Sequence, residues 1–486
     1  MTRARSLFAL ALGCLAACTQ PATSESARRI PLSACQLAAP GKAPRVAARC
    51  GTLDVFEDRA ARAGRTLRLR VAVVEATGAK RSKEPLFLLA GGPGQSITEL
   101  FPELAAAFGR AGLDRDLVLV DQRGTGGSGL LRCPRSERLV SGPDDAKRTA
   151  LECLPTLRAD LRHYGTADAM DDLDDVREAL GYERIDLWGV SYGTRAALTY
   201  LRQHPDRVRA VVLDGVAPPD WAIPLDAARN AQRGLDRTLA RCSEDEACRA
   251  AFPAVADDLR ALLARCDAHP EVVRAAHPVT GVLTEVKVDR ASLGMMLRVL
   301  SYSSEGAAVV PLLVHEAQRT GDLRLIAAHA LLAREVIDIA DGMYLSVVCA
   351  EDEPFVPVDE AKARAAGTYT GDEAFASIRA ACSVWPRGTL RPDQRTPVTS
   401  SVPVLLLSGE LDPVTPPSVA EQAARTLSRS KSIVLEGEAH GVTTRGCMPR
   451  VIADFLRRGG PEGLDTSCLA QHRPLPFFTS FKGPPP

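Results

Sequence analysis

The sequence predicts an α/β fold, with a doubly wound, mostly parallel sheet that is interrupted by an inserted, mostly helical domain. Short continuous apolar runs alternate with helical patterns in the first half of the chain, as in parallel strands covered on both faces. This alternation stops after Asp214 and resumes near Val402. The length of 486 residues also exceeds that of one small domain.

The N-terminus is expected to direct export. Arg3 and Arg5 precede an apolar stretch, 7–17, that is too short to span a bilayer. The sequence Leu-Ala-Ala-Cys at 15–18 resembles the lipobox of bacterial lipoproteins, which implies that 1–17 is a signal peptide and that Cys18 is acylated. The alternative is an ordinary secretory peptide in which Cys18 is incidental. Thr19, where an aspartate would mark inner-membrane retention, favours the outer membrane.

The cysteine content agrees with an oxidising compartment. Of the thirteen cysteines, eleven remain when Cys14 and Cys18 are set aside, far more than a cytosolic enzyme usually carries, whereas the periplasm or cell surface permits disulfides. No Cys-x-x-Cys spacing indicates a metal site. Pairing between sequence neighbours, one of several possible connectivities, leaves Cys266 unpaired and predicts the bridges Cys35–Cys50, Cys133–Cys153, Cys242–Cys248, Cys349–Cys382 and Cys447–Cys468.

The first part of the core is expected at 46–215, after a tether at 18–45. Alternating apolar residues at 67–73 predict a half-buried strand. Buried strands are predicted at 86–90, 117–120, 185–188 and 210–213, with helices at 170–180 and 195–203 among them.

A helical cap is expected at 216–399, where amphipathic stretches such as 229–241 and 257–267 occur with few strand signals. The α/β pattern returns at 400–472, with strands predicted at 402–407 and 432–435. The tail, 473–486, is rich in proline and is expected to be extended.

The motif Gly-Val-Ser-Tyr-Gly at 189–193 places Ser191 between a predicted strand and a predicted helix. This is the context in which the Gly-x-Ser-x-Gly motif forms a sharp turn that exposes a nucleophilic hydroxyl. The flanking glycines allow close backbone approach, and the amides at the start of the helix point to where negative charge develops. Ser191 is therefore the candidate nucleophile.

A serine hydroxyl needs a base, and the base needs a carboxylate. Of the eight histidines, only His440 directly follows a late predicted strand, and His472 is a weaker choice. Asp412 follows the strand at 402–407, and the order Ser191, Asp412, His440 is that of the α/β-hydrolases. Asp214 and Glu410 are the alternative carboxylates.

The glycine-rich sequence that follows the first buried strand can supply an oxyanion hole. Gly91 and Gly92 allow close backbone approach, and Pro93 stiffens the turn. The predicted donors are the amides of Tyr192 and of Gly91 or Gly92. A phosphate-binding loop is the alternative, but the Gly-Lys-Ser/Thr ending of such loops is missing.

Four motifs in this order resemble those of the proline iminopeptidase and secreted tripeptidyl aminopeptidase group of serine peptidases. They are Gly-Gly-Pro-Gly at 91–94, Asp-Gln-Arg-Gly-Thr-Gly-Gly-Ser at 121–128, Gly-Val-Ser-Tyr-Gly at 189–193 and Gly-Glu-Leu-Asp at 409–412. The resemblance covers about 50–468, including a tripeptidyl-aminopeptidase-like C-terminal segment, and implies an α/β-hydrolase fold with a cap over the active site. Ala90 departs from the histidine usual in proline iminopeptidases. The loop at 121–124 is expected to buttress the site.

The resemblance implies an aminopeptidase, which must hold a cationic amine. Glu351, Asp352 and Glu353 are the candidate amine ligands, although such a cluster is also typical of a solvated turn. The expected substrate is a peptide with a free N-terminus. A carboxylesterase with the same triad is the first alternative, and a non-catalytic envelope binding protein is an alternative of another class.

The composition excludes some partners. The 60 basic and 60 acidic residues cancel, so nothing in the charge balance indicates nucleic-acid binding. The expected membrane contact is the lipid anchor alone. The proposed chemistry requires no cofactor and no metal, and the sequence does not indicate an oligomeric state.

Overall fold

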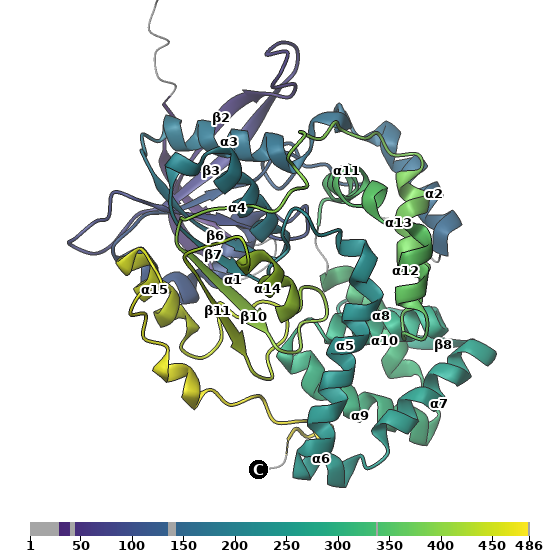
Figure 1. Ribbon diagram of the computed structural model, residues 1–486. Helices are drawn as coiled ribbons and strands as arrows, with labels where there is room; N and C mark the ends of the chain where they lie inside the picture. Colours follow the sequence, from purple (N-terminus) through teal and green to yellow (C-terminus); the bar gives the residue numbers. More distant parts are fainter. Residues whose placement is uncertain (1–28, 39–43, 135–141, 337–338, 485–486) are drawn as a thin grey trace, which may run out of the picture.

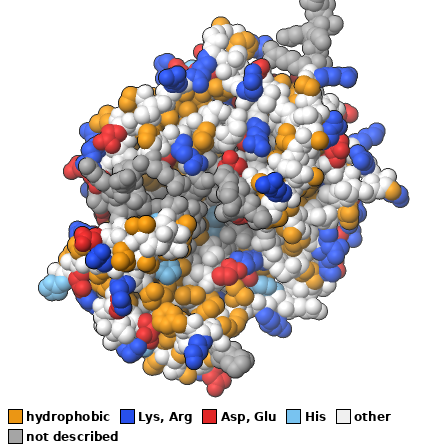
Figure 2. Space-filling view, turned by 180° about the vertical axis from the view of Figure 1, so that it is seen from behind, with side chains coloured by type: hydrophobic (Ala, Val, Ile, Leu, Met, Phe, Trp, Pro, Cys, Tyr) orange, Lys and Arg blue, Asp and Glu red, His pale blue; other side chains and the backbone are white. Residues whose placement is uncertain are grey.

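The computed structural model describes residues 29–38, 44–134, 142–336 and 339–484. The expected signal peptide, Cys18 and the first part of the expected tether lie outside the described residues. In the view of Figure 2, charged side chains of both signs are interspersed over the surface.

A nine-stranded sheet forms the core, in the order β1-β2-β3-β5-β4-β6-β7-β10-β11. From β5 to β11 neighbouring strands are parallel, whereas β1, β2, β3 and β5 pair antiparallel. The strands are β1 Ser33–Leu37, β2 Val46–Phe56, β3 Thr66–Val74, β4 Leu86–Leu89, β5 Leu117–Val120, β6 Ile185–Val190, β7 Val208–Asp214, β10 Val404–Gly409 and β11 Ser430–Leu435. The mostly parallel sheet confirms the predicted fold class.

Helices cover both faces of this sheet because alternate strand residues point to opposite sides. On one face, Phe87 and Leu187 pack in the same core cluster as residues of α3, α4 and α14. On the other, Leu88 and Trp188 pack with α1 and α15. The helices named here are α1 Ile97–Phe108, α3 Thr166–Ala179, α4 Tyr192–Gln203, α14 Pro417–Ala424 and α15 Met448–Arg458.

The segment between β7 and β10 forms most of a second body, which Figure 1 shows on one side of the sheet. Its helices are α5 Ile223–Glu244, α6 Glu246–Ala251, α7 Val255–Ala268, α8 Arg290–Leu300, α9 Ser304–Thr320, α10 Arg324–Val336, α11 Asp341–Glu351, α12 Val358–Ala365 and α13 Glu373–Cys382. Buried Leu235, Leu262 and Val310 belong to a core cluster of its own. Helix α2 (Gly142–Cys153), which precedes β6 in the chain, packs against α13.

This second body also contains a β-hairpin, β8 Glu271–Ala276 and β9 Leu283–Val288, that the helical pattern did not predict. Part of the expected tether differs too: Ser33–Leu37 form the edge strand β1. The disulfide Cys35–Cys50 holds this strand on β2, and Leu37 is fully buried.

All five predicted disulfides are present, and Cys266 is a buried free cysteine. Each joins cysteines between 6 and 33 residues apart, so sequence neighbours could meet within one local unit.

The C-terminal segment runs from the core to the second body (Figure 1). Phe477 is buried in the core cluster of that body, beneath the Arg241 guanidinium, whose carbon lies 5.2 Å from the ring centroid. The Phe478 amide donates to the Ala308 carbonyl oxygen of α9 at 3.1 Å. Across the described ranges, no helix combines the length and the apolar character that crossing a membrane demands.

Candidate active site

Ser191 occupies the turn between β6 and α4. Its backbone has φ 57° and ψ −126°, and φ is positive at only one other non-glycine residue of the described chain, Arg62. A Cβ at Gly189 would overlap the Gly193 carbonyl, and a Cβ at Gly193 would overlap the Leu89 carbonyl oxygen. The two glycines therefore permit the strained turn, which leaves the serine partly accessible to solvent.

The His440 imidazole meets Asp412 beside this turn. His440 Nδ1 lies 2.7 Å from Asp412 Oδ2, and Asp412 is fully buried. Asp412 Oδ1 accepts the amides of Val414 and Thr415, both at 2.8 Å, so the loop after β10 fixes the carboxylate. The Thr415 hydroxyl donates to Asp412 Oδ2 at 2.8 Å and lies 3.2 Å from His440 Nδ1. This fixed carboxylate orients the imidazole.

The two groups shift each other's pKa. Burial raises the pKa of Asp412, but the His440 charge and the hydrogen bonds outweigh it, so the pKa of Asp412 lies below its ordinary value. Burial lowers the pKa of His440, but Asp412 and then Asp214 outweigh it, so the pKa of His440 lies above 6.5. Asp412 thus stabilises the imidazolium that forms when the histidine takes a proton.

Asp214, the alternative carboxylate, contacts the neighbouring backbone instead of the imidazole. Its oxygens accept the amides of Val442 and Thr443 and the Thr443 hydroxyl, at 2.7–3.0 Å. Its own carbonyl oxygen accepts the Ser191 amide at 2.8 Å. Asp214 therefore joins the Ser191 turn to the loop that carries His440.

Glu410 and His472 also have other contacts. The Glu410 carboxylate accepts the Gly437 amide and pairs with Arg237. His472 Nε2 lies 3.2 Å from the Glu436 carbonyl oxygen. The contact with Asp412 therefore distinguishes His440 from His472.

The glycine-rich loop after β4 lies directly beside Ser191. A Cβ at Gly91 would be 3.0 Å from the Ser191 Cβ, and Gly92 has a φ of 104°. Tyr192 begins α4, where amides lack partners within the helix. The three predicted oxyanion donors, Tyr192, Gly91 and Gly92, thus lie on the two segments that flank the serine.

The loop at 121–124 contacts two helices next to the site, α1 and α3. Asp121 accepts the Ser96 hydroxyl at 2.8 Å and the Thr98 amide at 3.0 Å, which fixes the start of α1 after the glycine-rich loop. Arg123 forms two hydrogen bonds of 2.7 Å with Asp172 of α3. The ion pair therefore joins two elements and does not close a local turn.

The three acids predicted to bind an amine are buried at the end of α11, each with internal partners. Glu351 accepts the Thr166 amide and hydroxyl, both at 2.7 Å, and burial raises its pKa. The Thr166 hydroxyl also lies 2.8 Å from the Tyr192 hydroxyl. Asp352 pairs with Arg195 of α4 at 3.0 Å, and Glu353 pairs with Arg387 at 2.6 Å, which neutralises both.

Sequence reasoning missed Thr415 and two residues of the second body, Arg298 and Tyr302. Thr415 stands three residues after Asp412, where a turn hydroxyl could have been expected to bond the carboxylate. Tyr302 follows α8, and its carbonyl oxygen accepts the His440 amide at 3.2 Å. Its contact with His440 spans distant parts of the sequence, so no local pattern indicated it.

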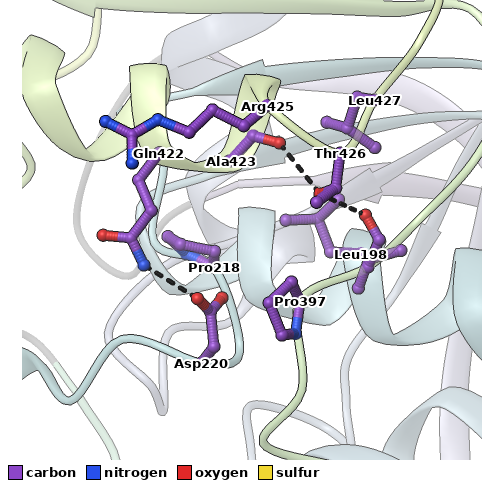
Figure 3. A pocket seen from close by; sticks show the side chains of 10 residues that line it. Leu198, Pro218, Asp220, Pro397, Gln422, Ala423, Arg425, Thr426 and Leu427 are labelled. Atoms are coloured by element: carbon purple, nitrogen blue, oxygen red, sulfur yellow. Dashed lines mark hydrogen bonds between the residues drawn. The ribbon is translucent and has the colours of Figure 1, made fainter.

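A separate hollow of about 180 Å³ lies between the loop after β7 and helix α14 (Figure 3). Gln422 donates to Asp220 across it at 2.8 Å. Its described lining includes none of the candidate catalytic residues. In the part of the chain that the structure describes, no group of three or more His, Cys, Asp or Glu residues is arranged to hold a metal ion.

Several known proteins are similar in sequence to this chain. The chain matches the alpha/beta hydrolase fold family over residues 84–442. It is similar to the serine protease Hip1 of Mycobacterium tuberculosis, with 25% identity over 467 residues covering 85% of each chain. It is also similar to a tripeptidyl aminopeptidase of Streptomyces coelicolor, with 25% identity over 494 residues covering 88% of this chain and 84% of that one. The crystal structure of a Mycobacterium smegmatis proline iminopeptidase covers 84% of this chain and 98% of its own, with 17% identity and a TM-score of 0.41.

The family match spans most of the chain and includes Ser191, Asp412 and His440. Two relatives that the chain covers over more than four fifths of their length are named a serine protease and a tripeptidyl aminopeptidase. The chain therefore belongs to the alpha/beta hydrolase fold family and is a serine hydrolase of that family.

Proposed function

We propose that the protein is an exported serine peptidase that cleaves peptide bonds near a free N-terminus through an acyl-enzyme on Ser191. The observation that carries the proposal is the strained Ser191 turn beside the buried Asp412–His440 pair. The similarity to a tripeptidyl aminopeptidase supports the choice of peptides over other acyl compounds.

In the proposed reaction, Ser191 Oγ attacks the substrate carbonyl carbon while His440 takes the hydroxyl proton. The amides of Tyr192 and of Gly91 or Gly92 bind the oxyanion, and Asp412 stabilises the imidazolium. His440 then gives its proton to the leaving amine, and the peptide bond breaks. Water, activated by the same histidine, hydrolyses the acyl-enzyme and restores Ser191.

Amine binding is assigned to Glu351 among the three acids. Asp352 and Glu353 form ion pairs with arginines, so a substrate ammonium would have to displace those partners. Glu351 instead accepts from the neutral Thr166 hydroxyl and amide, next to Tyr192. Under this assignment, Glu351→Gln raises KM for free-amine substrates more than for their N-acetylated forms.

Labelling with a fluorophosphonate probe tests whether Ser191 is the nucleophile. The wild type should be labelled and Ser191→Ala should not. An unlabelled wild type, as expected of a non-catalytic binding protein, would overturn the proposal, as would labelling that survives Ser191→Ala.

Matched substrates test the peptidase assignment. Tripeptidyl and aminoacyl anilides with free amines are compared with their N-acetylated forms and with short acyl esters. An aminopeptidase prefers the free amines. Equal cleavage of blocked and free anilides, or turnover of the esters alone, would favour the carboxylesterase.

Export and lipid anchoring are supported by the five disulfides and by the Leu-Ala-Ala-Cys sequence ending at Cys18. If Cys18 carries the proposed anchor, Cys18→Ser abolishes incorporation of a labelled fatty acid and releases the enzyme from the membrane fraction. Unchanged membrane association of this variant would contradict the anchor.

A further inference from the structure

One arginine and three tyrosines of the second body gather beside His440 and form what we term the recess: Arg298, Tyr302, Tyr344 and Tyr369. Tyr302 contacts the imidazole edge to face, with ring centroids 5.6 Å apart at an angle of 78°. The Arg298 guanidinium carbon lies 5.9 Å from the centroid of the Tyr302 ring. One aromatic side chain thus separates a cation from the proposed base, and Arg298, Tyr302 and His440 are all partly accessible.

Arg298 differs from two buried arginines near the site, Arg123 and Arg195. Arg123 and Arg195 each pair with an aspartate. Within the described ranges, no carboxylate lies at ion-pair distance from Arg298, and the groups that raise its pKa are Tyr302 first, then Tyr369 and Tyr344. Its positive charge therefore interacts with phenols and not with an ion-pair partner among the described residues.

Tyr369 is a second, independent indication of a ligand. It is 1% exposed, and its hydroxyl is buried without a hydrogen-bond partner. Its ring lies against Gly294, one turn before Arg298 on α8, and its hydroxyl interacts electrostatically with Arg298 and Tyr302. A buried unpaired hydroxyl is costly, which a ligand acceptor in the recess would offset.

Tyr344 of α11 is the third phenol near the guanidinium. Burial, then the charge of Asp352, raises its pKa to about 12, so its hydroxyl stays protonated at neutral pH. Asp352 itself is paired with Arg195. The recess therefore combines one guanidinium with three phenols, and these are groups whose N–H and O–H donors suit a carboxylate.

The position of the recess defines which part of the substrate it contacts. In the proposed reaction His440 protonates the leaving amine, so groups beyond His440 lie on the leaving-group side. We propose that Arg298, with Tyr302, Tyr344 and Tyr369, binds a carboxylate on the first residue after the scissile bond. This inference rests on the proposed function. The carboxylate is the C-terminus of a short peptide or an Asp or Glu side chain.

An ester pair tests the recess without requiring peptide cleavage. The substrates are 4-acetoxybenzoate, whose leaving group carries a carboxylate, and the neutral 4-acetoxybenzamide. The wild type should prefer the carboxylate in kcat/KM by about 10- to 100-fold, as expected of charge-assisted hydrogen bonds. The preference should fall to about one in Arg298→Met and be partly retained in Arg298→Lys. A preference that is missing from the wild type, or unchanged in Arg298→Met, overturns the proposal.

Two further variants separate binding from folding. Arg319→Met, on the exposed surface of α9, removes an arginine of the same body and should keep the wild-type preference. Tyr369→Phe removes only the unpaired hydroxyl, so it should reduce the preference several-fold without lowering the thermal stability. A loss of stability with an unchanged preference would identify Tyr369 as purely structural and would contradict its part in the recess.

Two pairs of peptide substrates distinguish the two sources of the carboxylate. A tetrapeptide with a free C-terminus is compared with its amide, and a tetrapeptide amide ending in Asp is compared with its Asn counterpart. A preference in the first pair identifies the terminal carboxylate, and one in the second identifies an acidic side chain. If no peptide is cleaved but the ester preference depends on Arg298, the peptidase proposal fails and the recess stands. If peptides are cleaved without either preference, the recess proposal fails alone.

Discussion

At Asp412, two backbone amides, one hydroxyl and one imidazole converge on two carboxylate oxygens. These contacts keep the carboxylate ionised although it is fully buried, and the pKa of Asp412 is lowered accordingly. The pair with His440 can therefore accept a proton on the imidazole without first ionising the acid.

The raised pKa of His440 predicts the pH dependence of the wild type. The neutral imidazole is the proposed base, so kcat/KM should fall as the pH drops through the pKa of His440, which lies above its ordinary value of 6.5. Asp412→Asn removes the negative charge, so the decline of kcat/KM on the acid side should move to lower pH while kcat falls by about 10⁴-fold. The pH–rate profiles of both proteins measure this shift, and an acid-side decline at the same pH in both would contradict the prediction.

Thr415 supplies a second test at the same carboxylate. Thr415→Val keeps the shape but removes the hydroxyl that donates to Asp412 Oδ2. Losing this hydrogen bond should raise the activation free energy by about 1.5 kcal/mol and so reduce kcat about tenfold, with KM little changed. Thr415→Ser is the matched control, since it retains the hydroxyl, and equal losses in both variants would assign the effect to packing.

At the scale of elements, α11 contacts a different segment of the site at each of its two ends. The Ala340 amide, just before α11, donates to the Gly94 carbonyl oxygen of the glycine-rich loop at 3.0 Å. At its other end, Glu351 reaches Thr166 and Asp352 pairs with Arg195 of the nucleophile helix. One helix therefore touches both segments that carry the proposed oxyanion donors.

The Asp352–Arg195 pair predicts a stability effect. Asp352→Asn leaves a buried guanidinium without its counter-charge, so the free energy of unfolding should fall by about 3 kcal/mol. Chemical denaturation measures this change. Asp359→Asn, an exposed acid on α12, is the control and should change stability by less than about 0.5 kcal/mol.

Individual elements also show which parts of the fold and of the site could be predicted from the sequence. The run at 117–120 coincides with β5 because a fully buried strand is apolar at every position. The β8–β9 hairpin was missed because half of its residues are exposed and few are fully buried, so it has no continuous apolar run. The Ser191 turn was readable from five adjacent residues. In contrast, the contacts of Glu351 with Thr166 and of Tyr302 with His440 depend on packing between distant segments.

At the scale of the whole molecule, the core supplies Ser191, Asp412 and His440, and the insertion supplies Arg298, Tyr302 and Tyr344. The insertion is held to the core by the Arg195–Asp352 pair and by α13, which packs on α2 and joins α11 through Cys349–Cys382.

A disulfide that closes a longer loop should stabilise the molecule more, because the chain entropy removed from the unfolded state rises with the logarithm of loop length. Replacing Cys349 and Cys382 with serine opens a loop of 33 residues and should cost about 3.7 kcal/mol, whereas the same change at Cys242 and Cys248 opens a loop of 6 and should cost about 2.2 kcal/mol. Urea unfolding of the two double variants checks the order. The reverse order would show that native packing, not chain entropy, decides the effect.

The docking of Phe477 into the second body has a consequence for the newly made chain. Ser191 is synthesised before the insertion, whereas Asp412, His440 and Phe477 follow it. Until the last of these leaves the ribosome, the nascent chain carries a serine without its proposed base, and the core cluster of the second body lacks one of its rings. The order of residues along the chain thus delays the proposed hydrolytic activity until the segment that follows the insertion has been translated.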